Sequence, residues 1–151
     1  MKVVAFLQNQ WWHDPEGVRR EIEKHGEKYR RRLLVYGLSQ CRSGKVLEKT
    51  IASVIGAPDF KDIYWENVSR QFGGRSAAKF PADLTHIGQV ILDQRPDVIL
   101  CFGKVASEAV PDLALCEDLH VLIADHPAAR RGHDSLHKMA KDLKELLNGM
   151  S

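Results

Sequence analysis

The chain of 151 residues has few cysteines and no long hydrophobic run. Cys41, Cys101 and Cys116 form no C-x-x-C pair, so this chain alone can build neither a disulfide framework nor a four-cysteine cluster. No apolar stretch approaches the roughly 20 residues of a membrane-spanning helix. The apolar start of the chain is too short for a secretory signal and lacks a small-residue cleavage site. We therefore expect a cytoplasmic protein without membrane association.

The motifs of several enzyme classes are also missing. The sequence contains neither the G-x-G-x-x-G of dinucleotide-binding folds nor the G-x-x-x-x-G-K-[ST] of phosphate-binding loops. It has no nucleophile elbow around a serine. His133 and His137 lie four residues apart, but no third ligand or helical Glu completes an H-E-x-x-H zinc site. We therefore expect no metal and no cofactor.

The composition is ordinary for a globular protein, with 44% hydrophobic and 28% charged residues, and the length fits one domain covering 1–151. The net charge of +2 says little about a polyanionic partner, but the basic residues are clustered. Such clusters either contact phosphates or form solvated helix faces. The clusters are Arg19 with Arg20, Lys28 with Arg30, Arg31 and Arg32, and Arg130 with Arg131.

Apolar runs alternate with amphipathic stretches along the chain. Strands are predicted at residues 3–8, 63–66, 98–102 and 121–124, and helices at 15–31, 43–55, 83–94 and 134–147. This alternation predicts an α/β fold, a single three-layer domain with a central parallel sheet of about four strands. Because runs 98–102 and 121–124 lack polar alternation, we expect both strands to be buried on both faces, with Cys101 in the core.

Helix ends are marked by capping residues. Asp14 before Pro15 starts the first helix, Ser43 is the expected cap of the second, and Gly56 followed by Pro58 stops it. The run 33–37 is ambiguous between a short strand and a buried loop. The glycine-containing, basic stretch 68–79 lacks periodicity and is predicted to be a surface loop, and such long loops tend to be functional.

Each predicted strand ends in a polar or glycine-containing tip. The tips hold Asn9, Asn67, Gly103, and Asp125 with His126. In an open α/β sheet, ligands bind beyond the carboxyl ends of the strands, so we expect these four tips to line one crevice.

Four segments carry a resemblance to a known family. Residues 89–106, with Pro96 and the Gly103-Lys104 turn, resemble the helix, Pro, strand and Leu-Gly-Lys-x-Ala segment of the uracil-DNA glycosylase superfamily. Residues 121–130 resemble that family's strand and His-Pro-Ser motif, with Ala128 in place of the serine. Residues 63–68 resemble the strand that ends in a uracil-recognising Asn. Residues 7–11 stand where the family has its water-activating motif, although Leu7 and Gln10 replace its Gly and Pro.

The resemblance covers nearly the whole chain and implies a monofunctional DNA glycosylase that excises uracil or a related deaminated base by water attack on the N-glycosidic bond. The implied partner is uracil-containing or deaminated DNA, and we expect a monomer. The iron-sulfur branches of the family are excluded as close relatives, because their four cysteines are absent.

The resemblance also implies a role for individual residues. Asn9 would orient the water and His126 would stabilise the leaving base. The family's stacking Phe has no match, so Trp11, Tyr36 or Phe72 would supply that face. The implied base-binding residues are Asn67, Gln8 and Trp11, and the implied DNA-binding residues are Gly103, Lys104, Arg75, Arg130 and Arg131. Two alternatives remain open, a catalytically silent module that binds nucleic acid or protein, and a nucleoside or nucleotide hydrolase.

Overall fold

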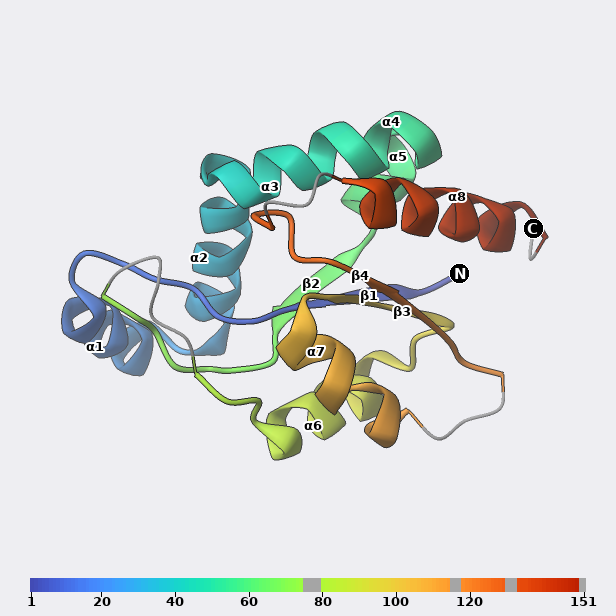
Figure 1. Cartoon of the computed structure of the whole chain (residues 1–151). Helices are drawn as coiled ribbons and strands as arrows, with labels where there is room; N and C mark the ends of the chain where they lie inside the picture. Colours follow the sequence, from blue (N-terminus) through green and yellow to red (C-terminus); the bar gives the residue numbers. More distant parts are fainter. Residues whose placement is uncertain (75–79, 115–117, 130–132, 150–151) are drawn as a thin grey trace.

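The computed structural model describes residues 1–74, 80–114, 118–129 and 133–149, and it confirms the expected α/β class. Four parallel strands form one sheet in the order β2-β1-β3-β4. The sheet carries helices on both faces, as Figure 1 shows. The strands are β1 (Val3–Leu7), β2 (Tyr64–Asn67), β3 (Val98–Phe102) and β4 (His120–Ala124).

Helices α3, α4, α5 and α8 cover one face of the sheet, and α6 and α7 cover the other, whereas the α1–α2 hairpin extends past one end of the sheet (Figure 1). Their bounds are α1 Pro15–His25, α2 Glu27–Gln40, α3 Arg42–Leu47, α4 Ser53–Ile55, α5 Ala57–Lys61, α6 Leu84–Gln94, α7 Lys104–Ala109 and α8 Asp134–Gly149, with a π-helical turn at Glu48–Ala52 and a 3-10 turn at Pro111–Leu113.

The two central strands, β1 and β3, are buried along their whole length. Their side chains alternate between two cores, as strand geometry requires. Leu7 and Phe102 pack in the core beneath α3 and α8, whereas Phe6 and Cys101 pack against α6 and α7. The predicted burial of Cys101 is therefore confirmed.

The first predicted helix, 15–31, is two helices. Gly26 has φ +84, a left-handed conformation that favours glycine, and it separates α1 from α2. The ambiguous run 33–37 is neither strand nor loop, because α2 continues through it. Leu34 is buried there, whereas Val35 and Tyr36 are exposed, and burial of one residue per turn suits a helix.

The cap of the second predicted helix lies two residues earlier than expected, at Cys41. The Cys41 sulfur, not Ser43, accepts the first-turn hydrogen bond from the Gly44 N–H, at 3.3 Å. Gly56, with φ +95, ends α4 as expected, but Pro58 lies within the short helix α5. Proline is tolerated there because the first turn of a helix has no partner for its N–H.

Strand β4 and the segment after β2 differ from the expectation. β4 lies at an edge of the sheet, and Ile123 is 55% exposed, so the prediction of burial on both faces is wrong for this strand. Val68 and Ser69 are buried rather than on the surface, because their N–H groups extend the pairing of β2 with β1. The described residues contain no helix with the length and apolarity that a membrane crossing requires.

Candidate functional site

The carboxyl ends of the four strands lie at one edge of the sheet, because all the strands are parallel. The chain passes from β1 to its neighbour β2 and then returns across β1 to β3, so the topological switch lies between β1 and β3. Open α/β sheets bind ligands at such a switch. In strand order the edge carries Asn67, then Gln8 and Asn9, then Gly103, then Asp125 and His126.

The ends of β1 and β2 are joined through their backbones. Asn67 pairs with Leu7, and the Ser69 N–H then donates to the Gln8 carbonyl at 3.0 Å. Asn67 is only 5% exposed. The structure therefore brings Asn67 and Gln8, two of the predicted base-binding residues, to adjacent strands.

The amide side chains after β1 use their nitrogen atoms as donors. Gln8 Nε2 donates to the Phe80 carbonyl at 3.4 Å, and Asn9 Nδ2 donates to the Gln10 carbonyl at 3.2 Å. Oδ1 is the side-chain atom of Asn9 that can accept a hydrogen bond.

Gly103 and His126 meet at the ends of β3 and β4. The Gly103 N–H donates to the Ala124 carbonyl at 2.9 Å, and Gly103 has φ +87. A β-carbon on Gly103 would lie 3.3 Å from the His126 Cβ. Glycine is therefore required at position 103 both for its backbone conformation and for the close approach of the histidine.

The tautomer of His126 follows from its backbone contact. The Ala128 N–H donates to His126 Nδ1 at 3.0 Å, so Nδ1 is an acceptor and carries no proton. In a neutral imidazole the proton then resides on Nε2. This contact makes Nε2 the ring nitrogen with donor capacity.

Ser135 ties the end of β4 to helix α8. Its Oγ accepts a hydrogen bond from the Asp125 N–H at 2.9 Å and lies 3.2 Å from Asp125 Oδ2. Because Asp125 directly precedes His126, these contacts limit the movement of the histidine backbone.

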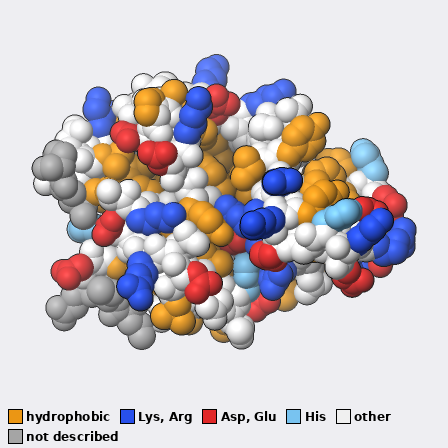
Figure 2. Space-filling view, turned by 180° about the vertical axis from the view of Figure 1, so that it is seen from behind, with side chains coloured by type: hydrophobic (Ala, Val, Ile, Leu, Met, Phe, Trp, Pro, Cys, Tyr) orange, Lys and Arg blue, Asp and Glu red, His pale blue; other side chains and the backbone are white. Residues whose placement is uncertain are grey.

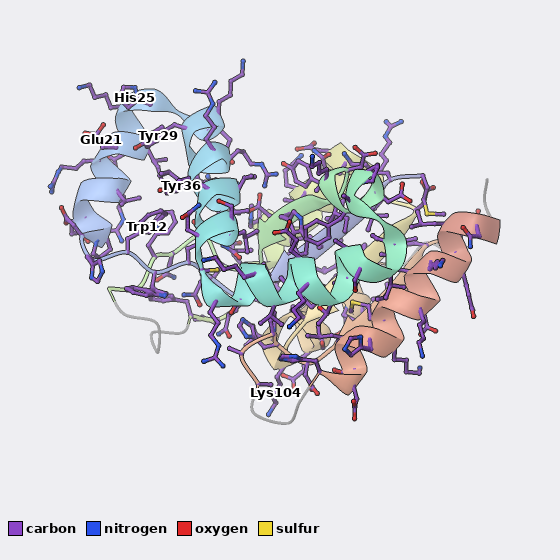
Figure 3. The ribbon with its side chains drawn as sticks, turned by 90° about the horizontal axis from the view of Figure 1, so that it is seen from above. Trp12, Glu21, His25, Tyr29, Tyr36 and Lys104 are labelled. Carbon is purple, nitrogen blue, oxygen red and sulfur yellow. The ribbon has the colours of Figure 1, made fainter. Side chains whose placement is uncertain are left out.

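The paired tryptophans lie beside the α1–α2 hairpin. Trp11 is 41% exposed and makes an edge-on contact with His13, with ring centroids 5.2 Å apart. Trp12 is more buried, and its indole Nε1 has no hydrogen-bond partner within the described part of the chain. Figure 3 shows Trp12 with Tyr29 and Tyr36 near this hairpin, away from Lys104.

Two of the predicted DNA-binding residues fall within the described part of the chain. Gly103 is the residue before α7, and Lys104, the first residue of α7, is exposed, with its Nζ 3.9 Å from Glu108 Oε1. The other three, Arg75, Arg130 and Arg131, lie outside the described residues.

Sequence reasoning missed a buried ion network next to Asn67. The Glu66 carboxylate is 1% exposed and receives two hydrogen bonds from the Arg30 guanidinium, at 3.0 and 2.8 Å. Arg31 Nη1 lies 3.2 Å from the same carboxylate, and His86 Nε2 lies 3.6 Å from it. Arg31 also contacts the Trp65 carbonyl. Arg30 and Arg31, which the sequence grouped with possible phosphate contacts, are therefore engaged inside the protein.

The ion pairs keep both Glu66 and Arg30 charged, although burial opposes each charge. Burial raises the pKa of Glu66, but His86, Arg30 and the Asn67 N–H together lower it to about 2. Burial opposes the charge on Arg30, yet its bonds to Glu66 and Glu27 raise its pKa above the ordinary value. A signal for this network was present, since a lone Glu inside an apolar strand requires a partner. The sequence could not show which arginine provides it.

No group of three His, Cys, Asp or Glu side chains suited to a metal ion occurs within the described residues. Comparison with protein-family models gave no match. Comparison with curated proteins gave none either.

Proposed function

We propose that this chain is a monofunctional DNA glycosylase of the uracil-DNA glycosylase superfamily, which excises uracil or a related deaminated base. Under this proposal the protein is a monomer, acts in the cytoplasm and needs no cofactor. The observation that carries it is the position of His126, whose Nδ1 accepts from the Ala128 N–H and whose side chain lies against Gly103 at the carboxyl edge of the parallel sheet.

The reaction breaks the bond between the sugar C1′ and the base nitrogen, and the electron pair of that bond leaves with the base. The target nucleotide must first leave the stack, which costs a few kcal/mol and is offset by contacts in a pocket. Negative charge then develops on the base. In the proposed mechanism, His126 Nε2–H donates to the O2 atom of uracil and stabilises this charge, which requires no proton transfer from the ring.

In the proposal, Asn67 recognises the base and Asn9 orients the attacking water. Asn67 offers a donor and an acceptor, so its side chain can pair with O4 and N3–H of uracil. Asn9 Oδ1 would orient the water whose oxygen bonds to C1′. An amide cannot accept a proton at neutral pH, so the water loses its proton to solvent or to the departing base. In the proposal, Gln8 and Trp11 complete the base contacts, and Lys104 with the arginines 75, 130 and 131 contacts phosphates.

The test uses single-stranded and duplex oligonucleotides that contain one uracil, incubated with excess protein and then treated with alkali. We expect strand scission at the uracil position, with a rate that falls about 10²- to 10³-fold in His126→Ala, the usual effect of removing a donor to a developing anion. His120→Ala is the matched control, because His120 lies at the other end of β4 and is exposed.

The outcomes separate the three candidate functions. Scission that His126→Ala reduces and His120→Ala leaves unchanged supports the glycosylase. Hydrolysis of free nucleosides without scission contradicts it in favour of a nucleoside hydrolase. Salt-sensitive oligonucleotide binding with neither reaction contradicts it in favour of a silent binding module.

A further inference from the structure

Three surface hollows follow one another along the outer side of α2. The first and second are both lined by Arg32, and the second and third by Val35 and Ser39, so neighbouring hollows adjoin along the helix. We name the three hollows together the α2 groove, from Lys28 at its start to Trp65 at its end. Figure 2 shows hydrophobic, basic and acidic side chains interspersed on one face of the molecule.

The start of the α2 groove is basic. Lys28 and Arg32 lie one helical turn apart and are exposed. Neither of the first two hollows is lined by an Asp or Glu among the described residues. Arg31 also lines the groove, but its guanidinium is already paired with Glu66. At this end of the groove, Lys28 and Arg32 are thus placed to meet an anionic ligand.

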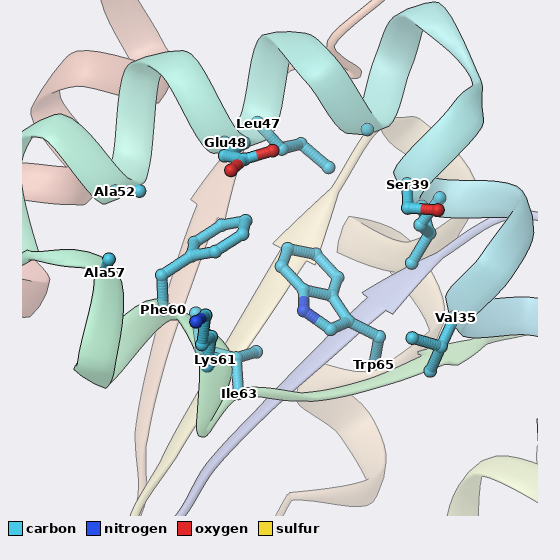
Figure 4. A pocket seen from close by; sticks show the side chains of 12 residues that line it. Val35, Ser39, Leu47, Glu48, Ala52, Ala57, Phe60, Lys61, Ile63 and Trp65 are labelled. Atoms are coloured by element: carbon cyan, nitrogen blue, oxygen red, sulfur yellow. The ribbon is translucent and has the colours of Figure 1, made fainter. Parts of the chain in front are cut away.

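The end of the α2 groove is mostly apolar, although Ser39, Glu48 and Lys61 also line it. It is a cavity of about 310 Å³ between α2, the π-helical turn Glu48–Ala52, α5 and β2. Figure 4 shows the rings of Phe60 and Trp65 inside it, with centroids 5.8 Å apart. Single π-helical turns are rare and often occur at functional sites. A cavity of this size can accept one large apolar group.

We propose that the α2 groove docks an extended acidic segment of a partner protein, anchored by one large apolar side chain in the Phe60–Trp65 cavity. Lys28 and Ser39 are separated by about 17 Å of helix at ~1.5 Å per residue. An extended peptide covers that distance in about five residues. The segment therefore has its acidic residues about five positions from its apolar anchor.

The Phe60–Trp65 cavity suits a peptide better than a nucleic acid as the ligand of the groove. A base placed in the cavity would lose hydrogen bonds to water that its mostly apolar walls do not replace, which costs free energy. A Phe or Leu side chain has no such groups and gains from burial. The basic end would suit either ligand, so the cavity favours the peptide.

The test measures fluorescence anisotropy of labelled probes with the full chain. The first probe is a peptide with four Asp or Glu residues about five positions from a Phe, and the second replaces the Phe with Ser. The third is an oligothymidylate of similar length. We expect the first probe to bind at micromolar concentration, at least about tenfold more tightly than the second and third, and more weakly as salt rises above about 0.1 M.

Pairs of variants, one in the α2 groove and one elsewhere, test where the peptide binds. Ser39→Trp fills the junction of the hollows and should weaken the first probe at least about tenfold. Ser53→Trp is its control, since both serines are exposed and each donates to the carbonyl three residues before it. Lys28→Glu with Arg32→Glu should weaken binding similarly, whereas Lys141→Glu with Lys144→Glu on α8 should not. His126→Ala should bind the peptide normally, so this result is independent of excision activity.

Several results would overturn the proposal. Equal binding of the Ser-containing peptide would remove the apolar anchor from the interaction. Equal or tighter binding of the oligothymidylate, lost in Ser39→Trp, would make the groove a nucleic-acid surface. Absence of peptide binding at millimolar concentration, or equal loss in both tryptophan variants, would rule out docking at this groove.

Discussion

The backbone of Gly103 lies against the side chain of His126, and this contact joins the ends of β3 and β4. A methyl group at position 103 would face the His126 Cβ at 3.3 Å and the His126 Cδ2 at 3.7 Å. The contact therefore links the conformation of one residue to the position of the imidazole.

Replacing Gly103 with alanine should affect both stability and excision. We expect Gly103→Ala to lower the free energy of unfolding by about 1–3 kcal/mol, because alanine is strained at φ +87. The displaced imidazole should also slow excision. Gly88→Ala is the control, since Gly88 lies within α6 with open space around it, and alanine there should stabilise by up to about 1 kcal/mol. Urea denaturation and single-turnover excision measure both effects. Unchanged excision by Gly103→Ala would argue against the role of His126.

The Glu66 network predicts a loss of stability in acid. Glu66 has a pKa of about 2 in the folded chain and an ordinary value of 4.5, so between these values the unfolded chain binds more protons. The stabilisation, about 3 kcal/mol, is complete above pH 4.5 and lost as the pH falls toward 2. Glu66→Gln should remove most of this pH dependence.

The same variant should be less stable at neutral pH by about 3–5 kcal/mol, because the buried charge of Arg30 loses its partner. Urea denaturation from about pH 2 to about pH 6 measures both effects. The exposed Glu23→Gln on α1 should keep the wild-type curve. A Glu66→Gln protein with the wild-type pH dependence would assign the acid sensitivity to other carboxylates.

The proposed role of Asn9 predicts that an aspartate at this position increases the excision rate. In the proposed mechanism Asn9 orients water without accepting its proton, so Asn9→Asp would add a general base. General-base catalysis contributes about 10²- to 10⁴-fold where the geometry is retained, and we expect an increase of at least about tenfold in the single-turnover rate at neutral pH. Asn148→Asp, on the exposed end of α8, should leave the rate unchanged. A slower Asn9→Asp protein would contradict the assignment of Asn9 to the water.

The cysteines should differ in reactivity. Burial raises the pKa of the Cys101 thiol to about 12, and its side chain is inaccessible, whereas Cys41 is exposed. A thiol reagent at about pH 8 should label Cys41 in the native chain and Cys101 only after unfolding. Mass spectrometry of digested protein identifies the labelled sites, and Cys41→Ser is the control. Labelling of native Cys101 at the rate of Cys41 would show that the core opens around β3.

The sequence predicted the central strands, the parallel sheet, and helices α6 and α8. These elements have clear local signals, such as the continuous apolar run of β3. The division of the first helix at Gly26 was missed. The helical state of 33–37 was also missed, because a short apolar run has no decisive period and its state depends on which face meets the core.

The candidate site, like the fold, could be predicted from the sequence only in part. The strand tips could be predicted, since a polar residue after each apolar run is visible in the sequence. The pairing of Glu66 with Arg30 could not be predicted, because these residues are 36 positions apart and meet only after folding. The exposure of Ile123 depends on the absence of a strand beyond β4 in the described sheet, which no local pattern reveals.

The position of β4 at the edge of the sheet matters for handling the protein. β4 pairs with β3 alone among the described strands, so one side of its backbone offers unused hydrogen-bonding groups beside the exposed Ile123. Such an edge is a template on which another chain can add, and natural proteins discourage this with lysine. A lysine introduced at Ile123 should thus keep concentrated samples from self-associating, with the sheet unchanged.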